Sequence, residues 1–211
     1  MGQIEDFWKG RDPVIENMLL REGAVEIDRL ERPEVMSRIP PFIGMNVLDL
    51  GAGIGRFTTE FAKKAGSVTA LDFVPQFIEC NKKHNAQFSN IVYLCADAKT
   101  VDFPKNCFDL IFVSGFFMYL DDGEFARIAH KISNWLKIGG HLFFRDCCSP
   151  HSQTVFEQYS YRRSIYHYHK LMDPLLTHID SGSIQVYIDH FANPFRCYWL
   201  YRKDRIESAD K

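Results

Sequence analysis

Residues 47–58, with the sequence VLDLGAGIGRFT, join an apolar strand to a glycine-rich turn and the start of a helix. Gly51 and Gly53 permit backbone conformations and a close ligand approach that a Cβ atom would obstruct. Asp49 stands just ahead of the turn, where its carboxylate can lie beside a bound cation or amine. A strand, a glycine turn and a helix in this order predict an α/β fold that binds a cofactor at the turn.

The spacing of the glycines decides which cofactor the turn suits. The nicotinamide fingerprint Gly-x-Gly-x-x-Gly, counted from Gly51, needs its last glycine where Arg56 stands, and Gly55 comes one residue early. A phosphate-binding loop ending in Gly-Lys-Ser/Thr is also absent from the sequence. The pattern Asp-x-Gly-x-Gly-x-Gly instead resembles motif I of the Rossmann-like methyltransferases, which bind S-adenosylmethionine. A tight turn without a ligand is the competing interpretation.

Polar residues follow the predicted strands at 67–72, 91–98 and 108–114. Asp72 comes about 20 residues after the turn, where α/β nucleotide folds place an acid on the ribose hydroxyls. Asp97 can accept a hydrogen bond from an adenine amino group. Open parallel sheets bind ligands at the carboxyl ends of their strands. The cofactor residues expected at these ends are Asp72, Phe73, Asp97, Ala98 and Ser114.

The remaining apolar segments alternate with helical patterns, as a parallel sheet with crossover helices requires. Helices are expected at 58–65, 75–87 and 123–136, and strands at 141–145, 183–192 and 196–202. Gly139-Gly140 supplies a stop before the strand at 141–145, and Asn193-Pro194 signals a turn between the last two strands. The sequence predicts a doubly wound α/β core. The final hairpin matches the antiparallel last strand of the seven-stranded, mostly parallel sheet of class I methyltransferases.

The first 41 residues are predicted to be helical and partly amphipathic. They form either a helix packed on the sheet or a lid that covers cofactor and substrate, and both can hold at once. Phe7 and Trp8 are candidates to bind a cationic substrate against their π faces. The expected organisation is one methyltransferase domain, with a helical lid at 1–41, a cofactor-binding core at 42–146, and a substrate-side insertion with the final hairpin at 147–211.

Composition restricts the class of protein. A chain of 211 residues, 46% of them hydrophobic, supports one α/β domain with a substantial core. A net charge of −2 gives no overall basic surface, so a nucleic-acid partner is not favoured. No apolar run is long enough for membrane insertion, and the N-terminus lacks the pattern of a signal peptide. We expect a cytoplasmic protein.

The six cysteines include no Cys-x-x-Cys pair, and several lie in strand-like segments, which favours buried thiols in a reducing compartment. His167 and His169 lie at no zinc-site spacing from Cys147 or Cys148. We therefore expect no metal in the site.

Several segments outside the glycine motif narrow the family. They are FWK at 7–9, MLL at 18–20, ERPEV at 31–35, IPPF at 39–42, ALDF at 70–73, MYL at 118–120, WLK at 135–137 and FFRD at 143–146. Together they resemble the first methyltransferase domain of the phosphoethanolamine N-methyltransferases of plants and nematodes. The resemblance implies methyl transfer from S-adenosylmethionine to the amine of phosphoethanolamine, on the way to phosphocholine. The products would be N-methyl-phosphoethanolamine and S-adenosylhomocysteine.

Position by position, the resemblance places Gly51, Arg56, Asp72, Asp97, Ala98 and Ser114 around the cofactor. Tyr161-Arg162 matches part of a His-Tyr-Arg motif that contributes to phosphobase binding in the family. The departures from the family pattern are Ser114 for Asn, Gly115 for Trp, Cys147 for Ser and Ser160 for His. The second methyltransferase domain of the plant enzymes is not in the sequence, so later methylations are expected to involve a separate enzyme.

A phosphorylated amine needs a cationic clamp at its phosphate and a proton acceptor at its nitrogen. Tyr161, Arg162 and Arg163 are the clamp candidates, with a solvated basic loop as the alternative interpretation. Tyr119, directly or through water, is the first choice for the acceptor, and Asp146 is the second. Two other functions stay open: methylation of another amine, such as a protein α-amino terminus, and a non-catalytic module that binds S-adenosylmethionine.

Overall fold

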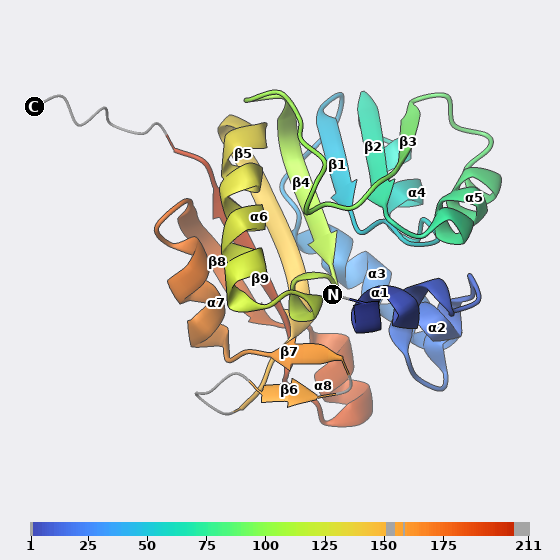
Figure 1. Cartoon of the computed structure of the whole chain (residues 1–211), viewed down its shortest axis with the longest axis vertical. Helices are drawn as coiled ribbons and strands as arrows, with labels where there is room; N and C mark the ends of the chain where they lie inside the picture. The colour runs from blue at the N-terminus through green and yellow to red at the C-terminus, as the bar shows by residue number, and fades with distance from the viewer. Residues whose placement is uncertain (1, 151–154, 158, 205–211) are drawn as a thin grey trace, which may run out of the picture.

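The computed structural model describes residues 2–150, 155–157 and 159–204. Its centre is a seven-stranded sheet with the order β3-β2-β1-β4-β5-β9-β8 (Figure 1). The strands are β1 Asn46–Leu50, β2 Ser67–Asp72, β3 Ile91–Cys95, β4 Phe108–Ser114, β5 Leu136–Cys147, β8 Thr177–Ser183 and β9 Arg196–Arg202. Every neighbouring pair is parallel except the two that involve β9. The expected class I methyltransferase architecture is confirmed.

Alternation along the strands places apolar side chains on both faces of the sheet. In β4, Leu110 and Phe112 lie in the cluster beneath α3 Ala24–Arg38, α4 Thr58–Ala62 and α8 Gln185–Phe191. Ile111 and Val113 point the other way, toward α6 Asp122–Trp135 and α7 Ile165–Met172. A strand buried on both faces reads as a continuous apolar run, which is why β4 is conspicuous in the sequence.

Local sequence signals mark the starts of several described helices. A capping box starts α6, because the Asp121 side chain accepts from Glu124 N and the Glu124 side chain accepts from Asp121 N. Pro75 occupies the first turn of α5 Pro75–His84, where its missing N–H costs nothing. Two short helices, α1 Gly2–Lys9 and α2 Ile15–Leu19, precede α3, so the N-terminal region is helical as expected.

The segment at 183–192 corrects a sequence prediction. It was expected to be a strand, but residues 185–191 form α8, and the strand that pairs with β9 lies before it at Thr177–Ser183. Ile184 and Tyr187 are buried and three residues apart, which is helical spacing rather than alternation. The expected stop at Gly139-Gly140 is also wrong, because β5 begins directly after α6 and continues through both glycines.

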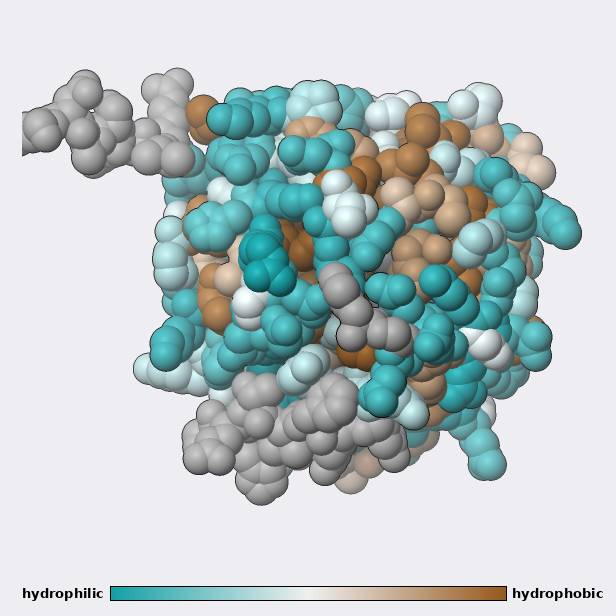
Figure 2. Space-filling view, viewed as in Figure 1, coloured by the Kyte–Doolittle hydropathy of each residue, from teal (hydrophilic) through white to brown (hydrophobic). Residues whose placement is uncertain are grey.

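The carboxyl ends of the parallel strands are covered by elements from distant parts of the chain. In Figure 1, α1 and α2 lie beside these ends together with the 3₁₀ turn η1 Phe117–Tyr119 and the hairpin of β6 Val155–Glu157 and β7 Ser160–Arg162. On the same face, hydrophilic side chains predominate over α6, whereas hydrophobic ones gather toward β2 and β3 (Figure 2). Among the described helices, none has both the length and the apolar character needed to cross a membrane.

Candidate active site

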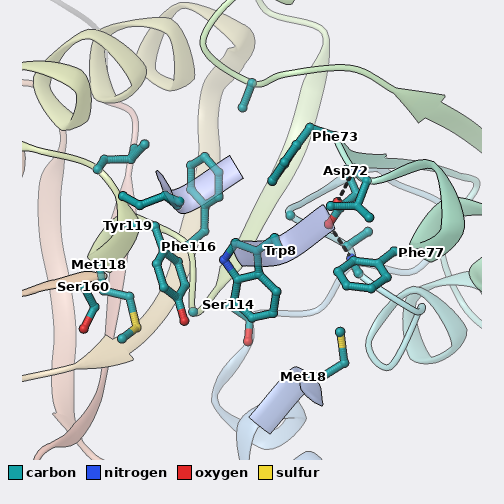
Figure 3. A pocket seen from close by; sticks show the side chains of 18 of the residues that line it. Trp8, Met18, Asp72, Phe73, Phe77, Ser114, Phe116, Met118, Tyr119 and Ser160 are labelled. Atoms are coloured by element: carbon teal, nitrogen blue, oxygen red, sulfur yellow. Dashed lines mark hydrogen bonds between the residues drawn. The ribbon is translucent and has the colours of Figure 1, made fainter. Parts of the chain in front are cut away.

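A cavity of about 630 Å³ lies at the carboxyl ends of the central strands. The chain leaves β1 for β2 on one side and later returns to β4 on the other, so the cavity opens where the strand order reverses, the usual ligand position in such sheets. Its volume is in the range of small-molecule sites. Figure 3 shows aromatic, sulfur-containing and polar side chains converging on it from the N-terminal helices, the end of β2, α5 and η1.

The glycine turn forms one wall of the cavity, and all three of its glycines have positive φ angles. Gly51 has φ 74° and Gly53 has φ 53°, a region that side chains rarely adopt. A Cβ at Gly53 would stand 3.1 Å from Met18 Sδ, and one at Gly51 would stand 3.3 Å from the Phe116 ring. Both glycines line the cavity, and the surface they leave is bare backbone that a ligand can approach closely.

Gly55 has a different role from the one expected of it. It does not line the cavity, and a Cβ there would clash with the amide group of Asn81 on α5. The glycine therefore lets the turn pack tightly on a neighbouring helix, and its assignment to cofactor binding stays a prediction.

Two buried carboxylates stand behind the turn and line the cavity. Asp72 accepts hydrogen bonds from Gly53 N and Val74 N, both at 2.9 Å, and burial raises its pKa to about 6. Asp49 accepts from Thr58 Oγ1 at 2.7 Å. Burial raises the pKa of Asp49 to about 7, and the nearby charge of Asp72 adds to the effect. Asp72 thus fixes the turn while facing the cavity, as its predicted cofactor contact requires.

The end of the cavity near β3 is lined by Phe73, Asp97 and Ala98, as predicted. Asp97 Oδ1 accepts from Lys99 N at 2.8 Å, so the carboxylate is held in place by its own loop. Lys99 Nζ lies 3.6 Å from Asp97, from Glu5 on α1 and from Glu124 on α6. This ammonium group links the first helix to the rim of the cavity.

Arg56 reaches the cavity wall, but its guanidinium is held by carboxylates of α3. It forms ion pairs with Asp28 and Glu31, and both carboxylates are buried. The side chain therefore joins α3 to the glycine turn, and its cofactor role is limited to shaping the wall.

Glu31 is the centre of a buried ionic cluster under the cavity. Its carboxylate accepts from Arg145 Nη1 at 2.8 Å, Arg145 Nη2 at 3.0 Å and the Tyr187 hydroxyl at 2.5 Å, in addition to Arg56. Arg145 Nε donates to Ser114 Oγ at 2.9 Å, which orients the predicted cofactor residue Ser114 at the cavity wall. Sequence reasoning did not find this cluster, because its members are separated by up to 156 positions.

Trp8 covers the middle of the cavity. Its ring centroid lies 5.2 Å from that of Tyr119 and 6.2 Å from that of Phe77, both in edge-on geometry, and Figure 3 shows the indole between these two rings. Phe7 does not line the cavity; it packs on Trp8 and on Tyr159, 5.2 Å from each. Of the two predicted aromatic substrate contacts, the structure places Trp8 at the cavity and Phe7 behind it, and both contacts stay predictions.

Tyr119 lies on η1 and lines the cavity opposite the glycine turn. Burial raises the pKa of its phenol, and the nearby Cys147 and Asp146 raise it further. The phenol is therefore neutral near pH 7. A neutral hydroxyl can accept one hydrogen bond from an amine and donate another.

Asp146 lies behind η1 and does not line the cavity. Its Oδ2 accepts from Met118 N at 2.9 Å and from the Tyr168 hydroxyl at 3.2 Å, while its buried Oδ1 has no hydrogen-bond partner among the described residues. Burial raises its pKa to about 7. The side chain holds the turn that carries Tyr119, and a direct contact between Asp146 and the substrate nitrogen stays a prediction.

The three residues predicted to bind the phosphate do not all face the cavity. Tyr161 and Arg162 on β7 line the cavity, but Arg163 is fully buried beside it. Arg163 donates to Asp122 Oδ1 at 2.8 Å and to the Phe117 and Leu120 carbonyls at 3.0 and 2.6 Å. It therefore fixes the loop after β4, and its assignment to substrate stays a prediction that these contacts do not favour.

Met18 and Arg196 are among the cavity residues that the sequence analysis did not assign to the site. Met18 belongs to the MLL segment, and its spacing from Trp8 carries no chemical signal. Arg196 begins β9 and reaches the site only because β9 pairs antiparallel with β5, which sets it opposite Cys147.

A family model described as "Methyltransferase domain" matches residues 47–140, from the first strand into the fifth. The structure of Phosphoethanolamine N-methyltransferase 1 of Haemonchus contortus, in complex with phosphoethanolamine and S-adenosylhomocysteine, matches with a TM-score of 0.88 and 27% identity. The match covers 99% of this chain and 49% of that one. The chain has the fold of the class I methyltransferases.

Curated relatives of this methyltransferase confirm the expected resemblance. Phosphoethanolamine N-methyltransferase 3 of Arabidopsis thaliana is 36% identical over 217 aligned residues, which cover 94% of this chain and 44% of the plant protein. Phosphoethanolamine N-methyltransferase 1 of Caenorhabditis elegans is 35% identical over 71% of this chain and 32% of the nematode protein. The methyltransferase thus spans less than half the length of these relatives.

Proposed function

We propose that this methyltransferase transfers a methyl group from S-adenosylmethionine to the amine of phosphoethanolamine. One observation carries the proposal: a single cavity joins the glycine turn and its acids to an arginine-lined end, with Tyr119 between them. The relatives are named for this activity, and the Haemonchus contortus structure holds both phosphoethanolamine and S-adenosylhomocysteine.

The residues at the glycine turn fit S-adenosylmethionine. The side-chain-free surface at Gly51 and Gly53 suits the close approach of its amino acid part. Asp72 suits the ribose hydroxyls, because an ionised carboxylate still has acceptor capacity beyond its two backbone hydrogen bonds. Asp97, Ala98 and Phe73 suit the adenine. When bound, this cofactor supplies a methyl group on a positively charged sulfur, which is already a strong methyl donor.

The protein's own contribution to the reaction is to position the amine and keep water out. Because the Tyr119 phenol is neutral, its oxygen accepts a hydrogen bond from an N–H of the substrate amine. This hydrogen bond directs the lone pair of the amine nitrogen toward the methyl donor. Trp8 closes the cavity over this point and contacts the Tyr119 ring. The ammonium gives up its proton to solvent water before the amine reacts, and the neutral phenol then orients the amine without binding a further proton.

The test is an assay of S-adenosylhomocysteine release from the purified chain. Phosphoethanolamine, its mono- and dimethyl forms, ethanolamine and a peptide with a free α-amino terminus are offered separately. Turnover with phosphoethanolamine, but not with ethanolamine or the peptide, supports the proposal. Turnover with the mono- and dimethyl forms defines how many methylations the chain performs. Turnover confined to the peptide favours an α-amino methyltransferase, whereas cofactor binding without turnover on any amine favours a non-catalytic module.

We also propose a cytoplasmic setting and a separate enzyme for the later methylations. The six cysteines all lie among the described residues and are free thiols, which supports a reducing compartment.

A further inference from the structure

Three arginines in or beside the cavity wall are held by carboxylates of this chain. Arg56 and Arg145 pair with the buried Glu31, and Arg163 pairs with Asp122. Each of these guanidinium groups has its charge balanced within the protein. None of the three is available to neutralise a ligand without losing a protein partner.

Arg196 is the exception. Its side chain is partly buried and lines the cavity, and its guanidinium forms no ion pair or hydrogen bond with any residue that the structure describes. Its neighbour on one side is the ring of Tyr187, whose centroid lies 5.4 Å from Arg196 Cζ. A charge held away from water without a counter-ion is costly, and an anionic ligand removes that cost.

The position of Arg196 identifies the part of the substrate that it faces. The strand register sets Arg196 opposite Cys147 on β5, and both side chains line the cavity with Tyr119 and Arg162. The pKa of Tyr119 is raised chiefly by burial, and the two groups that lower it are Arg196 and Arg162. Both guanidinium groups therefore lie near the phenol and line the same cavity.

We propose that Arg196 binds the phosphate of the substrate from the β9 side, opposite Arg162 on β7, and so selects phosphorylated amines over free ones. The inference rests on the proposed function for the identity of the amine. A phosphomonoester carries nearly two negative charges at neutral pH, which two guanidinium groups match in charge and in their planar donor geometry. Arg196 thereby takes the role that the sequence suggested for Arg163.

The test is calorimetric titration of phosphoethanolamine into the protein saturated with S-adenosylhomocysteine. Arg196→Gln should weaken phosphoethanolamine binding roughly 10- to 100-fold, the effect of losing hydrogen bonds to a charged group, and raise KM alike. Affinity for S-adenosylhomocysteine should stay within about twofold, since Arg196 lies away from the glycine turn. Arg202→Gln is the matched control: it makes the same change on the same strand, at an exposed position paired with Asp204, and should alter neither affinity.

Arg196→Lys keeps the charge and loses the planar fork, so it should weaken binding by less than the glutamine variant. If Arg196→Gln fails to fold by circular dichroism, the lysine variant decides, and unchanged phosphoethanolamine affinity overturns the proposal. Unchanged affinity in a folded Arg196→Gln protein overturns it as well. So does a wild-type chain that binds neither phosphoethanolamine nor inorganic phosphate.

The two proposals fail in different ways. Wild-type protein that binds phosphoethanolamine through Arg196 but releases no S-adenosylhomocysteine refutes the proposed function and keeps the phosphate site. Wild-type protein that methylates phosphoethanolamine while Arg196→Gln keeps the same KM refutes the phosphate site and keeps the function.

Discussion

Replacing Glu31 by glutamine removes one negative charge from the ionic cluster beneath the cavity while keeping the size of the side chain. The carboxylate is fully buried and is shared by Arg145, Arg56 and the Tyr187 hydroxyl. The variant leaves two buried guanidinium groups with one fewer counter-ion, and a glutamine oxygen can satisfy only part of the donors that converge there. We therefore expect a large loss of stability.

Two independent arguments give the size of the effect. Removing one partner of a buried ion pair costs about 3–5 kcal/mol. The pKa of Glu31 is lowered from 4.5 to about 2: burial, the largest effect, opposes this, and the charges of Arg145 and Arg56 overcome it. At about 1.4 kcal/mol per pKa unit, that shift corresponds to about 3 kcal/mol of folding free energy. Both routes predict a loss of about 3 kcal/mol or more at pH 7.

The sign of the pH dependence follows from the direction of the shift. Between pH 4.5 and about 2 the unfolded chain binds a proton at Glu31 that the folded chain does not. The stabilisation is complete above pH 4.5 and is lost as the pH falls through that range. The difference in unfolding free energy between the wild type and Glu31→Gln should be constant from pH 7 to pH 5, and smaller by about 1 kcal/mol at pH 3.5.

Urea denaturation of both proteins at pH 7, 5 and 3.5 measures this difference. Glu26→Gln is the matched control, because Glu26 is an exposed residue of the same helix that pairs with Arg29. It should leave the denaturation midpoint unchanged. A Glu31→Gln protein as stable as the wild type, or a difference that does not shrink at pH 3.5, refutes the assignment of Glu31 as a buried counter-ion.

Three further predictions concern the cavity. Asp72→Ala should weaken S-adenosylmethionine binding by about 1–3 kcal/mol in calorimetry, because a charged acceptor is lost; unchanged affinity in a folded variant contradicts the ribose assignment. Tyr119→Phe should lower kcat with phosphoethanolamine about 10-fold or more while leaving cofactor affinity intact, and full activity would exclude the phenol from the reaction. Asp146→Asn should flatten the pH dependence of stability. With its pKa raised from 3.8 to about 7, Asp146 makes the wild type less stable as the pH rises through that window, and an unaltered slope in urea denaturation counts against this role.

Much of the sheet could be predicted because buried parallel strands leave continuous apolar runs bounded by polar residues. The segments at 67–72, 108–114 and 196–202 form β2, β4 and β9 with the predicted bounds. The prediction of a strand at 183–192 was wrong, because a short apolar stretch of this length fits a helix as well as a strand. Only the pairing of Thr177–Ser183 with β9 excludes the strand there.

The donor end of the site was easier to predict than the acceptor end. Asp49, Asp72 and the glycines follow strands that are close in sequence, so local patterns place them together. At the acceptor end, two adjacent arginines were indistinguishable by sequence, yet only Arg162 lines the cavity, whereas Arg163 is held by Asp122. Arg196 comes from a strand whose partner depends on the whole topology.

The two ends of the cavity differ in charge, and this difference bears on the proposed reaction. Asp49, Asp72 and Asp97 stand at one end, while Arg162 and Arg196 stand at the other, near Tyr119. A sulfonium donor is favoured near the acids and a phosphate near Arg162 and Arg196, so the charges of the two ligands favour this order along the cavity. The amine then lies between them, beside the neutral phenol. An unphosphorylated amine has no phosphate for the arginines to bind. It would therefore rotate freely in the cavity and would not be held in the orientation that methyl transfer requires.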